Sequence, residues 1–98
     1  MRRILKQVIP WNANDEVMIQ VPMGSLHLDI QLQNDEMTVW YLAGSELRAV
    51  EWLTFRIVGT GWELPDDFAH NHYWLKTIQH DDYVWHVFLK APTQERLP

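Results

Sequence analysis

The sequence predicts an all-β protein: a single-domain antiparallel sandwich or small barrel of about seven short strands. Two observations support this prediction. Apolar and polar residues alternate with period two along most of the chain, which places successive side chains on opposite faces of a sheet. Turn-forming residues interrupt the alternation at a spacing of roughly ten residues, as in antiparallel sheets with short connections.

The first hairpin is the most clearly specified element. Over residues 25–33 the even-numbered side chains are apolar and the odd-numbered ones are polar, and Asn34-Asp35 then forms a two-residue hairpin loop. A one-residue slip would place the two apolar faces on opposite sides, so the register is well determined. Pairing Gln33 with Glu36 puts Leu32 opposite Met37, Ile30 opposite Val39 and Leu28 opposite Tyr41.

A second hairpin is predicted over residues 73–90, with Asp81-Asp82 as its loop. Large side chains occupy both of its faces, so we expect a second sheet to cover one face and a loop or a second copy of the chain to cover the other. Trp74 and Trp85 are expected on one face, and Leu75 and Phe88 on the other. The predicted pairs are His80 with Tyr83, Ile78 with Trp85, Thr77 with His86 and Leu75 with Phe88.

A single β domain is expected over residues 1–98, because neither an internal repeat nor a linker interrupts the pattern. Residues 92–98 are expected to form a flexible tail. The loop 10–15, which contains Trp11, is one candidate cover for the last hairpin. Three further strands are predicted over residues 2–9, 17–21 and 53–57.

The composition limits the classes of function. Apolar residues make up 47% of the chain, which suits one hydrophobic core and not a disordered acidic chain. A net charge of −5 without a basic stripe argues against general nucleic-acid binding. Neither a membrane span nor a signal peptide is recognised, so a cytoplasmic protein is expected. The absence of cysteine excludes disulfides and thiolate metal sites.

The stretch FRIVGTGWELPDDF, residues 55–68, is the main candidate for a functional site. Residues 59–61, Gly-Thr-Gly, lack the remaining residues of a P-loop or a dinucleotide fingerprint, but two glycines can still form a small anion-binding nest. The simpler interpretation is a strand that ends in a bend with positive φ. Pro65 then starts a turn in which Asp66 or Asp67 caps the following residues.

A metal site is a further possibility in the same region. His70 and His72 are two residues apart and would point the same way on a strand, and Asp66 or Asp67 could complete a His/His/carboxylate set. A third ligand at a fixed spacing is missing from this pattern. The serines and threonines lack the Gly-x-Ser-x-Gly context of a hydrolase nucleophile.

Two motifs link the chain to a known group. Residues 54–67 read TFRI-x-GTG-x-x-LPDD, and residues 83–88 read Y-x-WHVF. With the alternation around residues 19–31, these motifs resemble a group of small phage and prophage proteins with a domain of unknown function. The resemblance covers most of residues 2–90 and implies a phage-encoded accessory protein that acts inside a bacterial cell. It assigns no catalytic residue, because the group has no established activity, and this chain departs from it in the segment 68–73.

Three functions from different classes therefore remain open. The first is a non-enzymatic, homo-oligomeric binding module for a host or phage protein, suggested by six tryptophans that a small domain cannot easily bury; it needs no cofactor. The second is a protein that sequesters a nucleotide-like molecule by ring stacking. The third is a metal-dependent enzyme. The candidate ligand or interaction residues are Arg56, Gly59, Thr60, Gly61, Trp62, Trp74 and Trp85, and the candidate metal ligands are Asp66, Asp67, His70 and His72.

Overall fold

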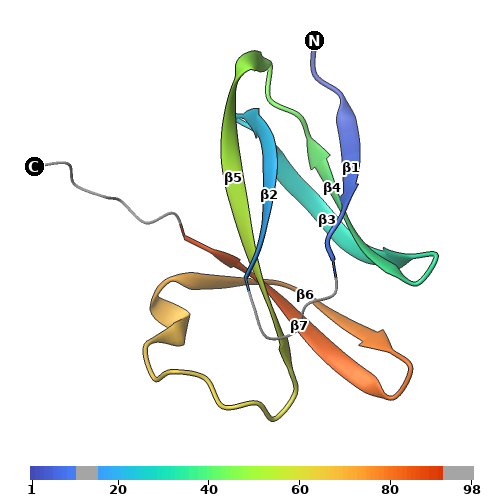
Figure 1. Ribbon diagram of the computed structural model, residues 1–98, viewed down its shortest axis with the longest axis vertical. Coiled ribbons are helices and arrows are strands. Elements are labelled where there is room, and N and C mark those ends of the chain that lie inside the picture. The colour runs from blue at the N-terminus through green and yellow to red at the C-terminus, as the bar shows by residue number, and fades with distance from the viewer. Residues whose placement is uncertain (11–15, 92–98) are drawn as a thin grey trace, which may run out of the picture.

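The computed structural model describes residues 1–10 and 16–91, and within β5 it leaves out the side chains of residues 46–48. The described part is built from seven strands and one short 3₁₀ turn (Figure 1). The loop around Trp11 and the tail 92–98 lie outside the described residues. The elements are β1 (Ile4–Val8), β2 (Glu16–Met23), β3 (Leu26–Gln33), β4 (Glu36–Leu42), β5 (Glu46–Gly59), η1 (Phe68–His70), β6 (His72–His80) and β7 (Tyr83–Lys90).

The strands form two antiparallel sheets, which confirms the predicted all-β sandwich in its open form. The three-stranded sheet has the order β1-β4-β3, and the four-stranded sheet has the order β2-β5-β7-β6. Strand β5 is much longer than the predicted 53–57 and runs through the molecule (Figure 1). β5 pairs with β2 from Glu46 to Arg56 and with β7 from Phe55 to Gly59. β7 therefore lies beside only the C-terminal end of β5.

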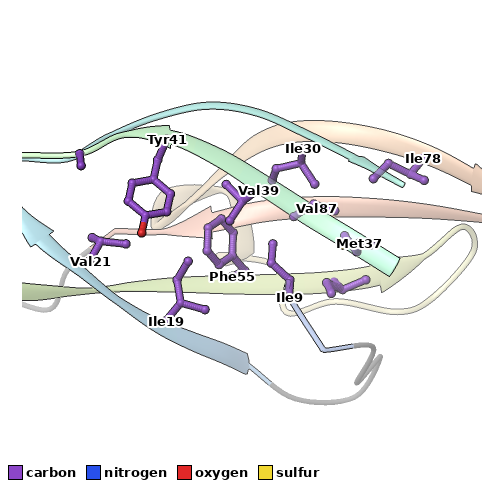
Figure 2. Close-up of a cluster of buried hydrophobic side chains, with 12 residues drawn as sticks. Ile9, Ile19, Val21, Ile30, Met37, Val39, Tyr41, Phe55, Ile78 and Val87 are labelled. Carbon is purple, nitrogen blue, oxygen red and sulfur yellow. The ribbon is translucent and has the colours of Figure 1, made fainter. Parts of the chain in front are cut away.

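The hydrophobic core lies between the two sheets. Phe55 of β5 and Val39 of β4 point toward each other from the two layers (Figure 2), and both are fully buried. Burial of one such side chain contributes about 1.5–3 kcal/mol. The core consists of the buried side chains Ile9, Ile19, Val21, Ile30, Met37, Val39, Tyr41, Ala43, Phe55, Ile57, Ile78 and Val87.

The first hairpin follows the predicted register near its loop and departs from it farther away. Asn34 and Asp35 both have positive φ, at 53° and 63°, as a two-residue hairpin turn requires. A bulge between His27 and Asp29 then shifts the pairing, so that His27 and not Leu28 lies opposite Tyr41. The predicted pair of Leu28 with Tyr41 is therefore wrong, and Leu28 is 47% exposed.

The last hairpin has a bulge at an equivalent place. The predicted register holds from His80 as far as Lys76, but a shift between Trp74 and Lys76 pairs Trp74 with Phe88. The predicted pair of Leu75 with Phe88 is wrong, and Trp74 lies on the opposite face from Trp85. The outward face of the hairpin at Phe88 is covered by the chain itself. Phe68 of η1 packs edge-on against the Phe88 ring, with the two ring centroids 5.1 Å apart.

The two bulged strands, β3 and β6, lie beside each other and join the sheets at one edge. Lys76 Nζ on β6 lies 3.1 Å from Asp29 Oδ1 on β3. The pKa of Asp29 is below its usual value, chiefly because the Gln31 amide donates to its carboxylate at 2.7 Å, and Lys76 lowers it further. Asp29 and Lys76 are the residues that directly follow the two bulges, and they form an ion pair between β3 and β6.

Candidate functional site

The candidate site begins at the turn that ends β5. Gly61 has a φ of 86°, a conformation that residues with a Cβ rarely adopt, and the Trp62 N–H donates to the Gly59 carbonyl at 3.3 Å. The predicted bend is present, with Gly61 as the residue of positive φ. Gly59 has a different role. A Cβ there would lie 2.7 Å from Nε1 of Trp62, so the indole can pack against the backbone only because Gly59 has no side chain.

The start of β7 lies directly beside this turn. Gly59 is paired with Trp85, and the Thr60 N–H donates to the Val84 carbonyl at 3.2 Å. The folded-back Trp62 meets Trp85 with ring centroids 5.7 Å apart and planes at 90°. Tyr83, two residues before Trp85 on the same face, stacks on it at 5.9 Å and 29°. Three aromatic rings therefore gather where β5 ends and β7 begins.

These rings surround a hollow of about 340 Å³, which we call the aromatic hollow. Trp85 is partly buried and packs against the core, whereas Trp62 is 40% and Tyr83 66% exposed. Asp82 is the one residue with an acidic or basic side chain among its described lining residues. The lining consists of Gly59, Thr60, Trp62, Asp82, Tyr83, Val84 and Trp85, all from the four-stranded sheet or the connections next to it.

Four of the predicted interaction residues thus line one hollow, and Gly61 shapes the turn beside it. Arg56 and Trp74 do not line it. Arg56 lies between the buried Phe55 and Ile57 and therefore points from the outer face of the sheet. Trp74 is on that outer face because of the β6 bulge, which the period-two pattern did not reveal.

A chain of hydrogen bonds on the outer face fixes Thr60. The Trp74 indole N–H donates to Thr77 Oγ1 at 3.0 Å, Thr77 Oγ1 lies 3.0 Å from His86 Nδ1, and His86 Nε2 lies 2.8 Å from Thr60 Oγ1. With Nδ1 of His86 as the acceptor and its Nε2–H as the donor, every group donates to the next one, and Thr60 donates to the Val84 carbonyl. These bonds attach the turn to the last hairpin and so hold the hollow in shape.

The turn is poorly suited to hold a phosphate. An anion nest needs several backbone N–H groups directed at one point, but those of Thr60 and Trp62 already donate to protein carbonyls. The Asp82 carboxylate in the lining would also repel an anion. The arrangement therefore favours a neutral or cationic ligand.

The geometry gives no support to a metal centre. Within the part of the chain that the structure describes, no three His, Asp or Glu side chains are gathered as metal ligands would be. His72 stacks on Phe68 at 3.9 Å, and its Nδ1 lies 2.9 Å from the Phe68 carbonyl, to which it donates. Asp67 precedes η1 but makes no capping hydrogen bond through its side chain.

Two other hollows lack this combination of features. The larger one, about 410 Å³, lies near the N-terminus, and its lining has no aromatic ring; the other, about 270 Å³, flanks the middle of β5. The first is lined by Met1, Arg3, Leu5, Pro22, Ala43 and Gly44, and the second by Glu51, Trp52, Leu53, Thr54, Leu89 and Lys90.

Sequence reasoning missed three lining residues, Asp82, Tyr83 and Val84. The local signal was present, because Tyr83 and Trp85 are two residues apart on one strand and share a face. What the sequence did not show was that β7 lies next to β5, which brings the hairpin loop to the glycine turn.

Comparisons with known proteins identify a family without assigning a function. The sequence matches one family model over residues 1–98, described as Domain of unknown function (DUF7352). Neither a search of curated proteins nor a search of solved structures found a match. Within residues 1–10 and 16–91, no helix is long and apolar enough to cross a membrane.

Proposed function

Because the chain belongs to the family described as Domain of unknown function (DUF7352), which supplies no activity, we propose a function from its surface. We propose that it is a non-enzymatic binding module that holds a partner protein at the aromatic hollow. The observation that carries this proposal is the trio of Trp62, Tyr83 and Trp85, in which a partly buried ring anchors two exposed ones. Exposed, rigidly held Trp and Tyr are the side chains that contribute most to protein interfaces.

The proposal includes the biological setting that the motif resemblance implies. We propose a phage-type accessory protein that works in the cytoplasm of a bacterial host and binds a host or phage protein. The support for this setting is the resemblance of residues 54–67 and 83–88 to small phage and prophage proteins.

We also propose that the chain forms a homo-oligomer, through the three-stranded sheet. Ile4, Leu42 and Leu26 lie side by side across β1, β4 and β3, and the two edge residues are 63% and 56% exposed. An apolar row of this kind on a sheet face favours burial against another surface. The last hairpin, by contrast, is already partly covered by Phe68.

The sequestration of a nucleotide-like molecule is the second candidate, and one observation favours it. Tyr83 and Trp85 offer ring faces on which a base could stack. Binding of the phosphates of a nucleotide is disfavoured, because Asp82 in the lining would repel them and the N–H groups of Thr60 and Trp62 already donate to protein carbonyls. Arg56 points to the outer face of the sheet, away from the hollow. A metal-dependent enzyme has no comparable support in the described residues.

Affinity capture from host cells with matched variants tests the binding module. Trp62→Ala/Tyr83→Ala removes two rings of the hollow, and Trp52→Ala/Tyr73→Ala removes the same two residue types, 56% and 58% exposed, elsewhere. We expect the wild type and the second variant to retain the same partner and the first variant to lose it, with all three folded by circular dichroism. A partner that the hollow variant retains in full would contradict the proposal. Native mass spectrometry showing a bound nucleotide or metal ion would favour the alternatives.

A further inference from the structure

The net negative charge of the chain lies mostly in the segment that lines the aromatic hollow, because basic residues are scarce there. The segment 57–89, which supplies all of its lining, contains one basic residue, Lys76, and five acidic ones. Its formal charge is therefore −4, most of the −5 of the whole chain. Lys76 is engaged with Asp29 at 3.1 Å. The five acidic residues are Glu63, Asp66, Asp67, Asp81 and Asp82, and all of them are exposed.

The ring arrangement provides a second, independent attraction for a cation. Trp62, Tyr83 and Trp85 all line the hollow, with the plane of Trp62 perpendicular to that of Trp85 and the plane of Tyr83 at 29° to it. The face of an aromatic ring is electron-rich and attracts an ammonium or guanidinium group within about 6 Å, most strongly for Trp. Asp82 in the same lining adds a carboxylate that can pair with that group.

We propose that the aromatic hollow takes the basic side chain, Lys or Arg, of a partner protein. This inference rests on the proposed binding function and specifies the chemistry of its partner. The alkyl stem of such a side chain packs against the rings while its charged end meets Asp82. A protein fits better than a small free cation, because the exposed Asp81 adjoins Asp82 in the hairpin loop and extends the negative surface, so that a further basic residue of the partner can pair there.

Nuclear magnetic resonance of the full chain tests the proposal with defined probes. The ligands are five-residue blocked glycine peptides that carry a central lysine, arginine or norleucine, together with adenosine monophosphate. The readout is the set of indole N–H signals, assigned through single Trp→Phe variants. We expect the lysine and arginine peptides to shift the Trp62 and Trp85 signals saturably and to bind at least about fivefold more tightly than the norleucine peptide.

Two matched pairs of variants sharpen the test. Asp82→Asn should weaken the lysine peptide about two- to fivefold, whereas Asp66→Asn, which changes the net charge equally outside the lining, should have a smaller effect. Trp62→Ala should remove most of the binding, and Trp52→Ala, which alters an exposed ring away from the hollow, should leave it unchanged. Raising the salt concentration should weaken the charged peptides and not norleucine.

The outcomes separate this inference from the function on which it rests. Equal binding of lysine and norleucine peptides, tighter binding of adenosine monophosphate, or no shift of the hollow signals with any basic peptide would each overturn the cation proposal. Loss of the captured partner in Trp62→Ala/Tyr83→Ala would still support the binding module in those cases. Capture that this variant does not change would overturn both.

Discussion

Substitution of Gly59 by alanine tests the reasoning on which the aromatic hollow depends. The new Cβ would lie 2.7 Å from Nε1 and 2.8 Å from Cε2 of Trp62, closer than a carbon atom can approach. Gly59 is a strand residue in a pair with Trp85, and its backbone must stay in register. Trp62 is 40% exposed and has room to move, so we expect its ring to swing away from Trp85.

The size of the effect follows from two opposing contributions. Loss of the edge-to-face contact between Trp62 and Trp85 costs about 0.5–1.5 kcal/mol. The φ of Gly59 is not positive, so alanine can adopt its backbone conformation. Such a replacement stabilises the folded protein by about 0.4–1 kcal/mol, because alanine lowers the conformational entropy of the unfolded chain. The single variant should therefore lose no more than about 1 kcal/mol of the free energy of unfolding. In a Trp62→Ala background the clash is absent, so the same substitution should be neutral or stabilising.

Urea unfolding of the four proteins of this cycle, followed by far-ultraviolet circular dichroism, measures the coupling. We expect a coupling free energy of about 1 kcal/mol between the substitutions Gly59→Ala and Trp62→Ala. Gly61→Ala is the control, because its strain comes from a φ of 86° and not from a neighbour; it should cost about 1–2 kcal/mol in either background. Equal losses for Gly59→Ala with and without the indole would refute the close-approach argument.

Three further predictions follow from the fold. Ile30→Asp should cost several kcal/mol in urea melts because Ile30 is 1% exposed, and Leu28→Asp should cost less than about 1 kcal/mol because the bulge exposes it; equal losses would refute the bulge. The pKa of Asp29 is lowered on folding, so its carboxylate stabilises the protein above pH 3.8. This contribution is under about 1 kcal/mol, because the pair with Lys76 is exposed, and it is lost as the pH falls below 3.8. The stability difference between Asp29→Asn and wild type should therefore shrink below that pH. Leu26→Lys should shift the sedimentation coefficient toward that of a monomer, and a wild type that is already monomeric at micromolar concentration would contradict the oligomer.

Local patterns were sufficient to predict the two hairpins and the class of fold. The loop at Asn34 and Asp35 determines which residues meet nearest to it, and the apolar face with Ile30 confirms that choice. These are contacts between residues close together in the sequence, where turn chemistry and period two act together. The same reasoning placed the positive φ at one of two glycines, and it is Gly61.

The bulges could not be predicted from alternation, because a bulge inserts one residue and reverses the faces of everything beyond it. Leu28 and Leu75 continue the period-two pattern in the sequence, so nothing local marks them. Both bulges lie where β3 and β6 meet at an edge, and Asp29 and Lys76, the residues directly after them, are 3.1 Å apart. A pairing of residues so far apart in the chain is not encoded in either hairpin alone.

The tryptophans show the same limit for the candidate site. Their number indicated surface or interface roles, but exposure by itself does not distinguish them, since Trp52 and Trp74 are more exposed than Trp62. What separates Trp62 is the missing side chain at Gly59, which lets its ring fold back toward β7. That effect requires β7 to lie beside the end of β5, with Trp85 as the partner of Gly59. A glycine at a strand end therefore indicates a ring-lined hollow only when the neighbouring strand is known. For this reason the glycine turn could be predicted as a candidate site from the sequence, whereas Asp82 and Tyr83 on the neighbouring hairpin could not.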